Sequence, residues 1–276
     1  MIHRITLFLL VPLFLSGCSW FGGDDGPEEI KPNPLPGFNR EVSIDAIWSR
    51  KVGKGAGDRA VKLKPAVSGG RIFAASADGH VKAFTTDTGR VIWEAQIKKF
   101  YSREALANGF TEDLDVITGG VGVGGDLVVV GTGSGEVVAM NQSDGSFAWK
   151  TPVSSEVLAP PQIDGDLVVV QSIDGKVAAY DAVDGTRRWV YTTNTPSLTL
   201  RGTATPLIAD EIIVAAFANG RVAFLDRDSG LASYEQRVAV AQGTTDLEKL
   251  VDIDGALALD DGKLFVASFQ SCFSFR

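Results

Sequence analysis

Four stretches of the 276-residue chain follow one sequence pattern, and this repeat constrains the fold more than any other feature. Each copy holds alternating apolar residues, a turn glycine, a second apolar run, another turn glycine and a closing aromatic residue. The copies cover residues 65–93, 121–149, 161–189 and 206–234. The closing aromatic residues are Trp93, Trp149, Trp189 and Tyr234. A spacing of roughly 40 to 45 residues with several short strands per copy is typical of β-propeller blades.

The local sequence of each copy explains how a blade forms. Alternating apolar residues predict strands with one buried face. The dipeptides at the first turn are Asp78-Gly79, Ser134-Gly135, Asp174-Gly175 and Asn219-Gly220. Asp-Gly and Asn-Gly favour tight hairpins because both turn positions require positive φ. The sequence therefore predicts an all-β fold, a propeller of four-stranded blades in which the closing aromatic residue fills the space between blades.

The closing aromatic residue belongs to a wider motif. Ala179, Asp181, Gly185 and Trp189 follow the pattern A-x-D-x-x-x-G-x-x-x-W, which resembles the pyrroloquinoline-quinone-type repeat family. In the large quinoprotein dehydrogenases, this tryptophan docking motif ties the blades together. Because the motif is structural there, the resemblance implies a blade and does not by itself imply the cofactor.

The first 17 residues have the features of a secretory signal sequence. Arg4 precedes the apolar stretch Ile5–Leu15, which is too short to cross a bilayer about 30 Å thick. The segment Leu15-Ser16-Gly17-Cys18 resembles a bacterial lipobox, which implies that Cys18 is lipidated and becomes the first mature residue. The alternative is a cysteine that follows an ordinary signal. Ser19, where inner-membrane retention would use Asp, points to the outer membrane.

The remaining chain divides into a tether and a fold. Residues 18–41 are rich in glycine and proline, so we predict a flexible tether, with a partial propeller over residues 42–276. Acidic residues outnumber basic ones by 34 to 26 and no basic stripe exists, so the sequence predicts no nucleic-acid partner. With Cys18 lipidated, Cys272 has no partner and no disulfide is predicted.

Two segments outside the repeats resemble the BamB family, outer-membrane lipoproteins of the β-barrel assembly machinery. They are Thr195–Gly202, which reads TPSLTLRG, and Gln242–Asp254, which reads QGTTDLEKLVDID. Thr118–Val121 and the lipobox with its tether are also similar to that family. The resemblance implies a non-enzymatic scaffold without a cofactor, held by lipid at the periplasmic face of the outer membrane.

The resemblance also implies a partner and the residues that bind it. In the family, five matching residues contribute to binding the periplasmic domains of BamA, the barrel-inserting subunit; here they are Leu198, Leu200, Arg201, Asp252 and Asp254. Unfolded outer-membrane proteins are further candidate partners. An arginine fork can hold a carboxylate, and leucines supply buried area. Two alternatives stay open: the leucines pack between strands, and Arg201 pairs internally with Asp252 or Asp254.

Other candidate chemistry in the sequence is weak. Gly120-x-Gly122-x-x-Gly125 matches a dinucleotide fingerprint, but an apolar strand follows where a helix should begin. Asp252-x-Asp254-Gly255 resembles a calcium loop that lacks its remaining ligands. His80, beside a turn glycine, is the only histidine after the signal, so no catalytic triad or zinc site can be built. We predict no catalytic residue, metal or cofactor.

The alternative function is a quinoprotein-like periplasmic enzyme that binds pyrroloquinoline quinone. The short blades and the missing calcium cluster argue against it. One further local prediction concerns Thr245 and Glu248, whose spacing predicts a capping box that opens a short helix through Leu250.

The chain is too short for the ring that the resemblance implies. About 235 residues at roughly 42 to 45 per blade give about five blades, against about eight in a BamB-like ring. Val42–Val52, with Trp48 at the docking position, resembles an outer strand without its inner strands. A fifth copy begins at Ala256 and fails at Gln270, where a glycine turn and a strand should follow. We therefore expect a truncated chain with exposed sheet edges, which favour aggregation.

Overall fold

The computed structural model describes residues 37, 42–101, 116–242, 244–269 and 272–275. The chain divides into two compact units, residues 1–45 and 46–276, and every described strand belongs to the second. The predicted signal sequence, the lipid site Cys18 and nearly all of the tether lie outside the described residues and stay predictions. No helix in the described part is long and apolar enough to cross a membrane.

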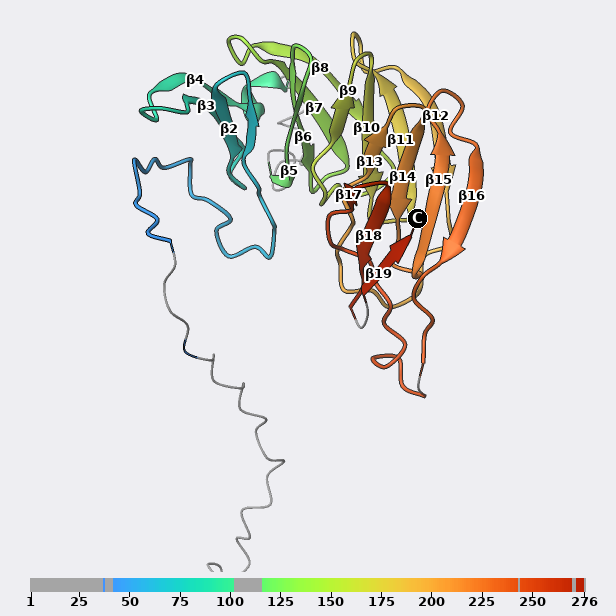
Figure 1. Ribbon diagram of the computed structural model, residues 1–276. Helices are drawn as coiled ribbons and strands as arrows, with labels where there is room; N and C mark the ends of the chain where they lie inside the picture. Colours follow the sequence, from blue (N-terminus) through green and yellow to red (C-terminus); the bar gives the residue numbers. More distant parts are fainter. Residues whose placement is uncertain (1–36, 38–41, 102–115, 243, 270–271, 276) are drawn as a thin grey trace, which may run out of the picture. The chain divides into compact units, whose positions relative to one another are not determined.

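The described strands form five antiparallel sheets, each built from strands in chain order (Figure 1). The first sheet contains β1 (Ala66–Ser68), β2 (Arg71–Ala75), β3 (His80–Thr85) and β4 (Val91–Gln96), with the 3₁₀ helix η2 (Ile97–Phe100) after it. The second contains β5 (Ile117–Gly124), β6 (Leu127–Thr132), β7 (Glu136–Asn141) and β8 (Phe147–Pro152). The third contains β9 (Gln162–Asp164), β10 (Leu167–Ser172), β11 (Lys176–Asp181) and β12 (Arg187–Thr192). The fourth contains β13 (Leu207–Ala209), β14 (Ile212–Ala216), β15 (Arg221–Asp226) and β16 (Ala232–Arg237). The fifth contains β17 (Ala258–Asp260), β18 (Lys263–Ala267) and β19 (Cys272–Phe275).

The hairpins form at the predicted turn glycines. Gly79 has a φ of 85° and Gly175 a φ of 78°, in the left-handed region of the backbone. That conformation costs other L-residues about 1–2 kcal/mol, and glycine avoids the cost. The predicted all-β fold with four-stranded blades is therefore confirmed.

Apolar side chains between consecutive sheets form the core. Four clusters of buried residues occur in the described part, and each joins one sheet to the next along the chain. In the third cluster, Val169 and Trp189 of the third sheet pack with Ile213 and Leu225 of the fourth. Sheets that each pack face to face with their chain neighbours are the blades of a propeller.

Tryptophans fasten each of the first three sheets to the next, and Trp48 docks on the first sheet in the same way. Their indole Nε1 groups donate hydrogen bonds of 2.8 to 3.0 Å to backbone carbonyls of the next sheet's last turn; the pairs are Trp48 with Thr86, Trp93 with Gln142, Trp149 with Ala182, and Trp189 with Arg227. Each ring also lies on a glycine of that turn. A Cβ on Gly230 would come within 2.4 Å of the Trp189 ring, so only glycine leaves room for it. The docking role predicted for these tryptophans is confirmed.

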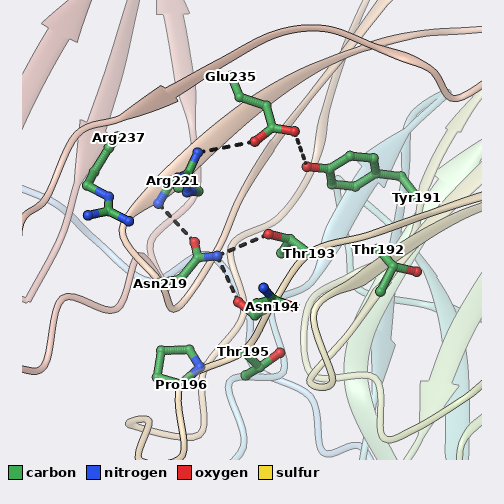
Figure 2. A pocket seen from close by; sticks show the side chains of 10 residues that line it. All are labelled: Tyr191, Thr192, Thr193, Asn194, Thr195, Pro196, Asn219, Arg221, Glu235 and Arg237. Carbon is green, nitrogen blue, oxygen red and sulfur yellow. Dashed lines mark hydrogen bonds and ion pairs between the residues drawn. The ribbon is translucent and has the colours of Figure 1, made fainter.

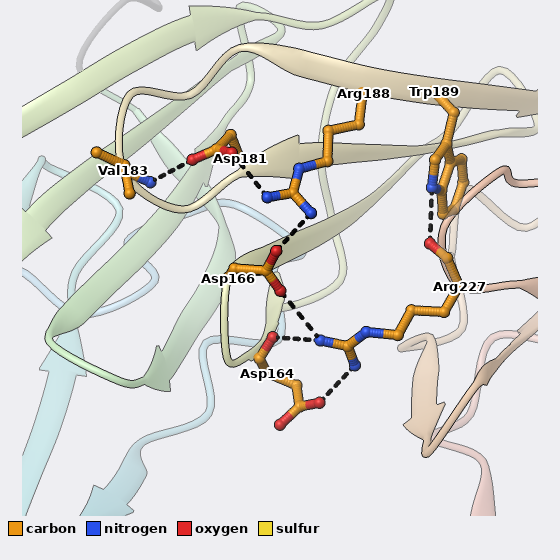
Figure 3. Close-up of polar contacts among 7 residues, drawn as sticks. All are labelled: Asp164, Asp166, Asp181, Val183, Arg188, Trp189 and Arg227. Atoms are coloured by element: carbon orange, nitrogen blue, oxygen red, sulfur yellow. Dashed lines mark hydrogen bonds and ion pairs between the residues drawn. The ribbon is translucent and has the colours of Figure 1, made fainter.

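Charged side chains reinforce the junction between the third and fourth sheets (Figure 3). Arg188 forms ion pairs with Asp166 and Asp181, each at 2.7 Å. Arg227, in the turn before β16, reaches back to pair with Asp164 and, at 3.5 Å, with Asp166. Hydrogen bonding from Arg188 holds the pKa of the Asp166 carboxyl below its ordinary value. The turn that carries Arg227 is thus held to the third sheet by side chains as well as by the indole bond.

The glycine-rich strand β5 allows the innermost strands to approach closely. A Cβ on Gly122 would lie 2.1 Å from the Pro161 carbonyl oxygen, and one on Gly120 would lie 3.0 Å from the Lys64 nitrogen. These glycines therefore serve packing between blades. The strand β6 follows them, as the sequence predicts, and no helix begins there to bind a dinucleotide.

Tyr234 does not fill the space between blades, and the prediction for it is wrong. Its side chain is 55% exposed, and its hydroxyl donates to Gln236 of the same strand. Alanine stands opposite the tryptophan in the first three sheets, whereas Phe224 stands opposite Tyr234. The two rings lie 5.7 Å apart, so the tyrosine covers its own sheet.

Two expectations about the ends of the repeat array also need correction. A strand does follow the point where the sequence pattern fails, because β19 pairs with β18, with Cys272 opposite Ala267. Antiparallel pairing uses backbone groups, so it does not require the repeat's side chains. Conversely, residues 42–52 form no strand, although Trp48 docks on the first sheet as predicted.

Candidate functional site

The predicted site residues lie in the segments that lead into the fourth and fifth sheets. Residues 193–206 connect β12 to β13, and residues 238–257 connect β16 to β17. The two segments touch, because the Leu200 amide donates to the Asp252 carboxylate at 2.7 Å. A Cβ on Gly202 would come within 2.6 Å of the Asp254 Cβ, so glycine permits this approach. The structure thus brings together residues that are far apart in the sequence.

Leu198 and Leu200 face two different pockets. Their side chains are 47% and 42% exposed, and neither lies in a strand, so the alternative of packing between strands is wrong. Leu198 lines a pocket of about 240 Å³ together with Val251. Leu200 lines another of about 250 Å³ together with Leu158 and Val61. Both leucines therefore present apolar surface that a partner can cover.

Arg201 pairs with Glu156, and the predicted internal pair with Asp252 or Asp254 is wrong. Its Nη2 lies 2.7 and 2.8 Å from the two carboxylate oxygens of Glu156. The Arg201 side chain is 54% exposed, whereas that of Glu156 is only 12% exposed. The backbone of Arg201 has a φ of 52°, in the left-handed region that costs a non-glycine residue about 1–2 kcal/mol. The ion pair helps to hold this unfavourable turn in place.

Glu156 is a site residue that the sequence reasoning missed, although the repeat contains a signal for it. Glu156 stands five residues before Pro161, and Arg201 stands five before Pro206, each proline leading into the first strand of its sheet. Equivalent positions of consecutive blades lie next to each other in a propeller. Opposite charges at one repeat position therefore predict an ion pair between neighbouring blades.

Asp252 supports the loop from beneath the surface. Only 1% of the residue is exposed, one carboxylate oxygen accepts the Leu200 amide, and the other has no partner among the described residues. Burial raises the pKa of this carboxyl, and the charge of Asp254 raises it further. In this structure Asp252 cannot reach a partner directly, and its contact with the loop fixes where Leu200 stands.

Asp254, in the segment before β17, forms an ion pair with Lys62, in the segment before β1. Its carboxylate lies 3.1 Å from the Lys62 ammonium group, and both residues line the pocket that contains Leu200. The side chain of Lys62 is 74% exposed, so solvent screens the pair and its contribution to stability is small.

The segment before Asp252 contains the predicted capping interactions without the predicted helix. The amides of Thr244 and Thr245 donate to Glu248 at 2.9 and 3.0 Å, and the Glu248 amide donates back to the Thr245 hydroxyl at 3.3 Å. Residues 246–249 form a hydrogen-bonded turn, so the short helix is a wrong prediction. These reciprocal bonds still fix the approach to Leu250 and Asp252.

The candidate metal and catalytic chemistry finds no support in the described part of the chain. It contains no group of three or more His, Cys, Asp or Glu residues placed to hold a metal. His80, the first residue of β3, lies 3.2 Å from Asp78 and 4.0 Å from Glu94. These contacts hold a hairpin turn.

Repeated four-stranded sheets tied by tryptophans, with half-exposed leucines on a restrained loop, define a propeller that carries a candidate docking surface. A family model described as "Outer membrane protein assembly factor BamB" matches residues 43–99 and 77–276. The chain belongs to the BamB family.

Individual relatives agree with this assignment. The outer membrane protein assembly factor BamB of Xanthomonas campestris pv. campestris is 41% identical over 277 residues, which cover 98% of this chain and 67% of that protein. The crystal structure of BamB from Moraxella catarrhalis has a TM-score of 0.68 and 31% identity, covering 77% of this chain and 60% of that one. The chain thus spans about two thirds of the length of the curated relatives it matches.

The fold also resembles that of an enzyme. A quinohemoprotein alcohol dehydrogenase from Pseudomonas putida HK5 has a TM-score of 0.54 and 18% identity, covering 76% of this chain and 39% of that one. At this identity the likeness shows the fold alone.

Proposed function

We propose that this chain is a non-enzymatic scaffold that binds BamA and assists the insertion of β-barrel proteins into the outer membrane. Its relatives are named outer membrane protein assembly factors, which supports this role. The mechanism is positional, because the blades present loops on which a partner domain, and also unfolded barrel proteins, can dock.

One observation carries the proposal: two leucines stand half exposed on a loop that is restrained before any partner binds. Asp252 holds the Leu200 amide, and Glu156 holds the Arg201 side chain. A loop that is already ordered loses less conformational entropy on association. In this proposal Leu198, Leu200 and Arg201 contact BamA, while Asp252 and Asp254 position the loop.

The direct test is capture of the purified periplasmic domains of BamA by the full chain in detergent. We expect Leu198→Asp together with Leu200→Asp to abolish capture, because each places a charge in an apolar contact. Leu231→Asp is the matched control, since Leu231 is 72% exposed and lies in the turn before β16. Unchanged capture by the double variant would refute the assignment of this surface.

A second variant separates contact from positioning at Arg201. Glu156→Gln removes the ion pair and leaves the arginine in place. If Arg201 grips the partner, Glu156→Gln retains most of the affinity whereas Arg201→Gln loses it. Equal losses in the two variants would show that Arg201 acts only by holding the loop.

We also propose that Cys18 carries the lipid anchor, with residues 1–17 removed and residues 18–41 serving as the tether at the periplasmic face. The lipobox resemblance supports this. Cys18→Ser should move the protein from the outer-membrane fraction to the soluble periplasmic fraction. Retention of the variant in the membrane fraction would contradict lipid anchoring at this position.

A further inference from the structure

Two arginines stand opposite each other on the fourth sheet, and only one of them is paired with a carboxylate. Arg221 of β15 stands directly opposite Arg237 of β16. Arg221 pairs with Glu235 at 3.3 Å, and the other oxygen of Glu235 accepts the Tyr191 hydroxyl at 2.8 Å. The Arg237 guanidinium has no ion pair or hydrogen bond with any residue that the structure describes (Figure 2). Like charges directly opposite each other destabilise a sheet, and Arg237 has no carboxylate among the described residues to offset its repulsion from Arg221.

Arg237 lies in the middle of a groove that contains Leu198. It lines a pocket of about 560 Å³ and also the pocket of about 240 Å³ that holds Leu198. Pro196 and Asn219 line both pockets as well, so the two pockets adjoin, and we call them together the Arg237 groove. The first pocket is lined mainly by polar residues. The second has the apolar residues Leu198 and Val251 beside the charged residues Asp246 and Lys249.

The polar wall of the groove is ordered in the free chain. The Asn219 amide nitrogen donates to the Thr193 hydroxyl at 3.0 Å and to the Asn194 carbonyl at 2.8 Å (Figure 2). Its carbonyl oxygen accepts the Arg221 amide at 3.1 Å. These bonds tie the loop after β12 to the turn before β15. The wall beside Arg237 is therefore fixed before a ligand arrives.

We propose that the Arg237 groove receives an acidic segment of the docked partner, with a carboxylate side chain on Arg237 and an apolar side chain beside Leu198. This inference rests on the proposed function, because Leu198 belongs to both surfaces. A guanidinium binds a carboxylate through two parallel hydrogen bonds, which fixes orientation as well as charge. A protein segment matches both ends of the groove, whereas a free anion would match only the polar end.

The test measures affinity for the purified periplasmic domains of BamA, using the full chain in detergent at low and high salt. We expect Arg237→Gln to weaken binding about tenfold at low salt and to flatten the salt dependence. Arg187→Gln is the matched control, because Arg187 is an exposed arginine on the outer strand of the third sheet. The thermal stability of Arg237→Gln should equal or exceed that of the wild type, since the substitution removes the repulsion with Arg221.

The outcomes distinguish this inference from the proposed function. If Leu198→Asp abolishes binding while Arg237→Gln keeps wild-type affinity at both salt concentrations, the groove inference is overturned and the docking surface stands. If neither variant changes the affinity, the proposed function itself fails. Calorimetric binding of phosphate that Arg237→Gln abolishes, with partner affinity unchanged, would assign the groove to a small anion and overturn the inference.

Discussion

The aromatic residue of the outer strand docks on the next sheet at the junction between the third and fourth sheets, whereas the aromatic residue at the equivalent position of the fourth sheet does not. In the first case Trp189 is 8% exposed, lies on Gly230 and donates to the Arg227 carbonyl. In the second, Tyr234 is 55% exposed and bonds within its own strand. The fourth and fifth sheets are joined instead by a shared apolar cluster and by the Leu200–Asp252 bond.

The difference has two sides, because each tryptophan docks on the turn between the third and fourth strands of the next sheet, and β19, the third strand of the fifth sheet, is the last described strand. A tryptophan opposite an alanine leaves the ring free to cross to the next blade. A tyrosine opposite Phe224 rests on its own sheet, and its hydroxyl donates to Gln236. The candidate docking segments lie at the junction between the fourth and fifth sheets. There the Leu200–Asp252 bond and the shared apolar cluster make the contacts between the sheets.

The largest expected effect is the difference in unfolding free energy between variants of Trp189 and Tyr234. Trp189→Ala should lower the free energy of unfolding by about 3–5 kcal/mol, because it empties a packed site and removes a hydrogen bond. Tyr234→Ala should cost less than about 1 kcal/mol, since an exposed side chain loses little burial. Urea unfolding followed by fluorescence and circular dichroism measures both. Equal losses of unfolding free energy would show that Tyr234 stabilises the fold as much as Trp189 does.

A pair of glycines tests the steric part of the docking. Gly230 and Gly262 have φ values of 69° and 68°, so alanine meets the same backbone strain at each. A Cβ at Gly230 would collide with Trp189, whereas nothing lies within 4 Å of a Cβ at Gly262. Gly230→Ala should therefore cost about 1–3 kcal/mol more than Gly262→Ala. Melting temperatures of the two variants check this, and similar values would mean that Trp189 shifts freely.

A smaller effect depends on pH and concerns the loop junction. The raised pKa of Asp252 means that the folded chain binds this proton more tightly than the unfolded chain. Protonation therefore contributes stability that is complete below the ordinary Asp pKa and is lost as pH rises through the raised value. Asp252→Asn should remove this decline while keeping an oxygen for the Leu200 amide. The measurement is the unfolding free energy at a series of pH values.

The exposed residue Asp260 supplies the control for that experiment. Asp260→Asn should leave the wild-type pH profile in place. If Asp252→Asn shows the same decline as the wild type, another group is responsible for it.

The smallest expected effect concerns the ion pairs of Arg227 between the third and fourth sheets. Arg227→Gln should lower stability by less than about 1 kcal/mol, because its partners are largely exposed and the indole bond to the Arg227 carbonyl remains. The loss should disappear in about 1 M salt, where charges are screened beyond about 3 Å. A loss as large as that of Trp189→Ala would mean that charges, and not the ring, close this junction.

Most of the local architecture of this protein follows from its sequence. Alternating apolar residues and turn glycines specify hairpins between segments that are neighbours in the chain, and the tryptophan motif specifies most of the contacts between blades. The hairpins are local and the tryptophan contacts recur once in each repeat, so propensity and pattern are enough to predict them. The sequence also directed attention to Leu198, Leu200, Arg201, Asp252 and Asp254 through the family resemblance of two loops.

The pairing of the side chains at the site depends on the tertiary structure. The Arg201–Glu156 contact spans 45 residues, the Leu200–Asp252 bond 52, and the Lys62–Asp254 bond 192. These pairs exist because the blades set distant loops side by side. The shared repeat position of Glu156 and Arg201 indicates that pair, whereas no sequence pattern indicates the Leu200–Asp252 and Lys62–Asp254 contacts. The burial of Asp252, and the lack of a partner for the Arg237 guanidinium among the described residues, are likewise not visible in the sequence. Burial and pairing depend on what the rest of the chain places around a residue.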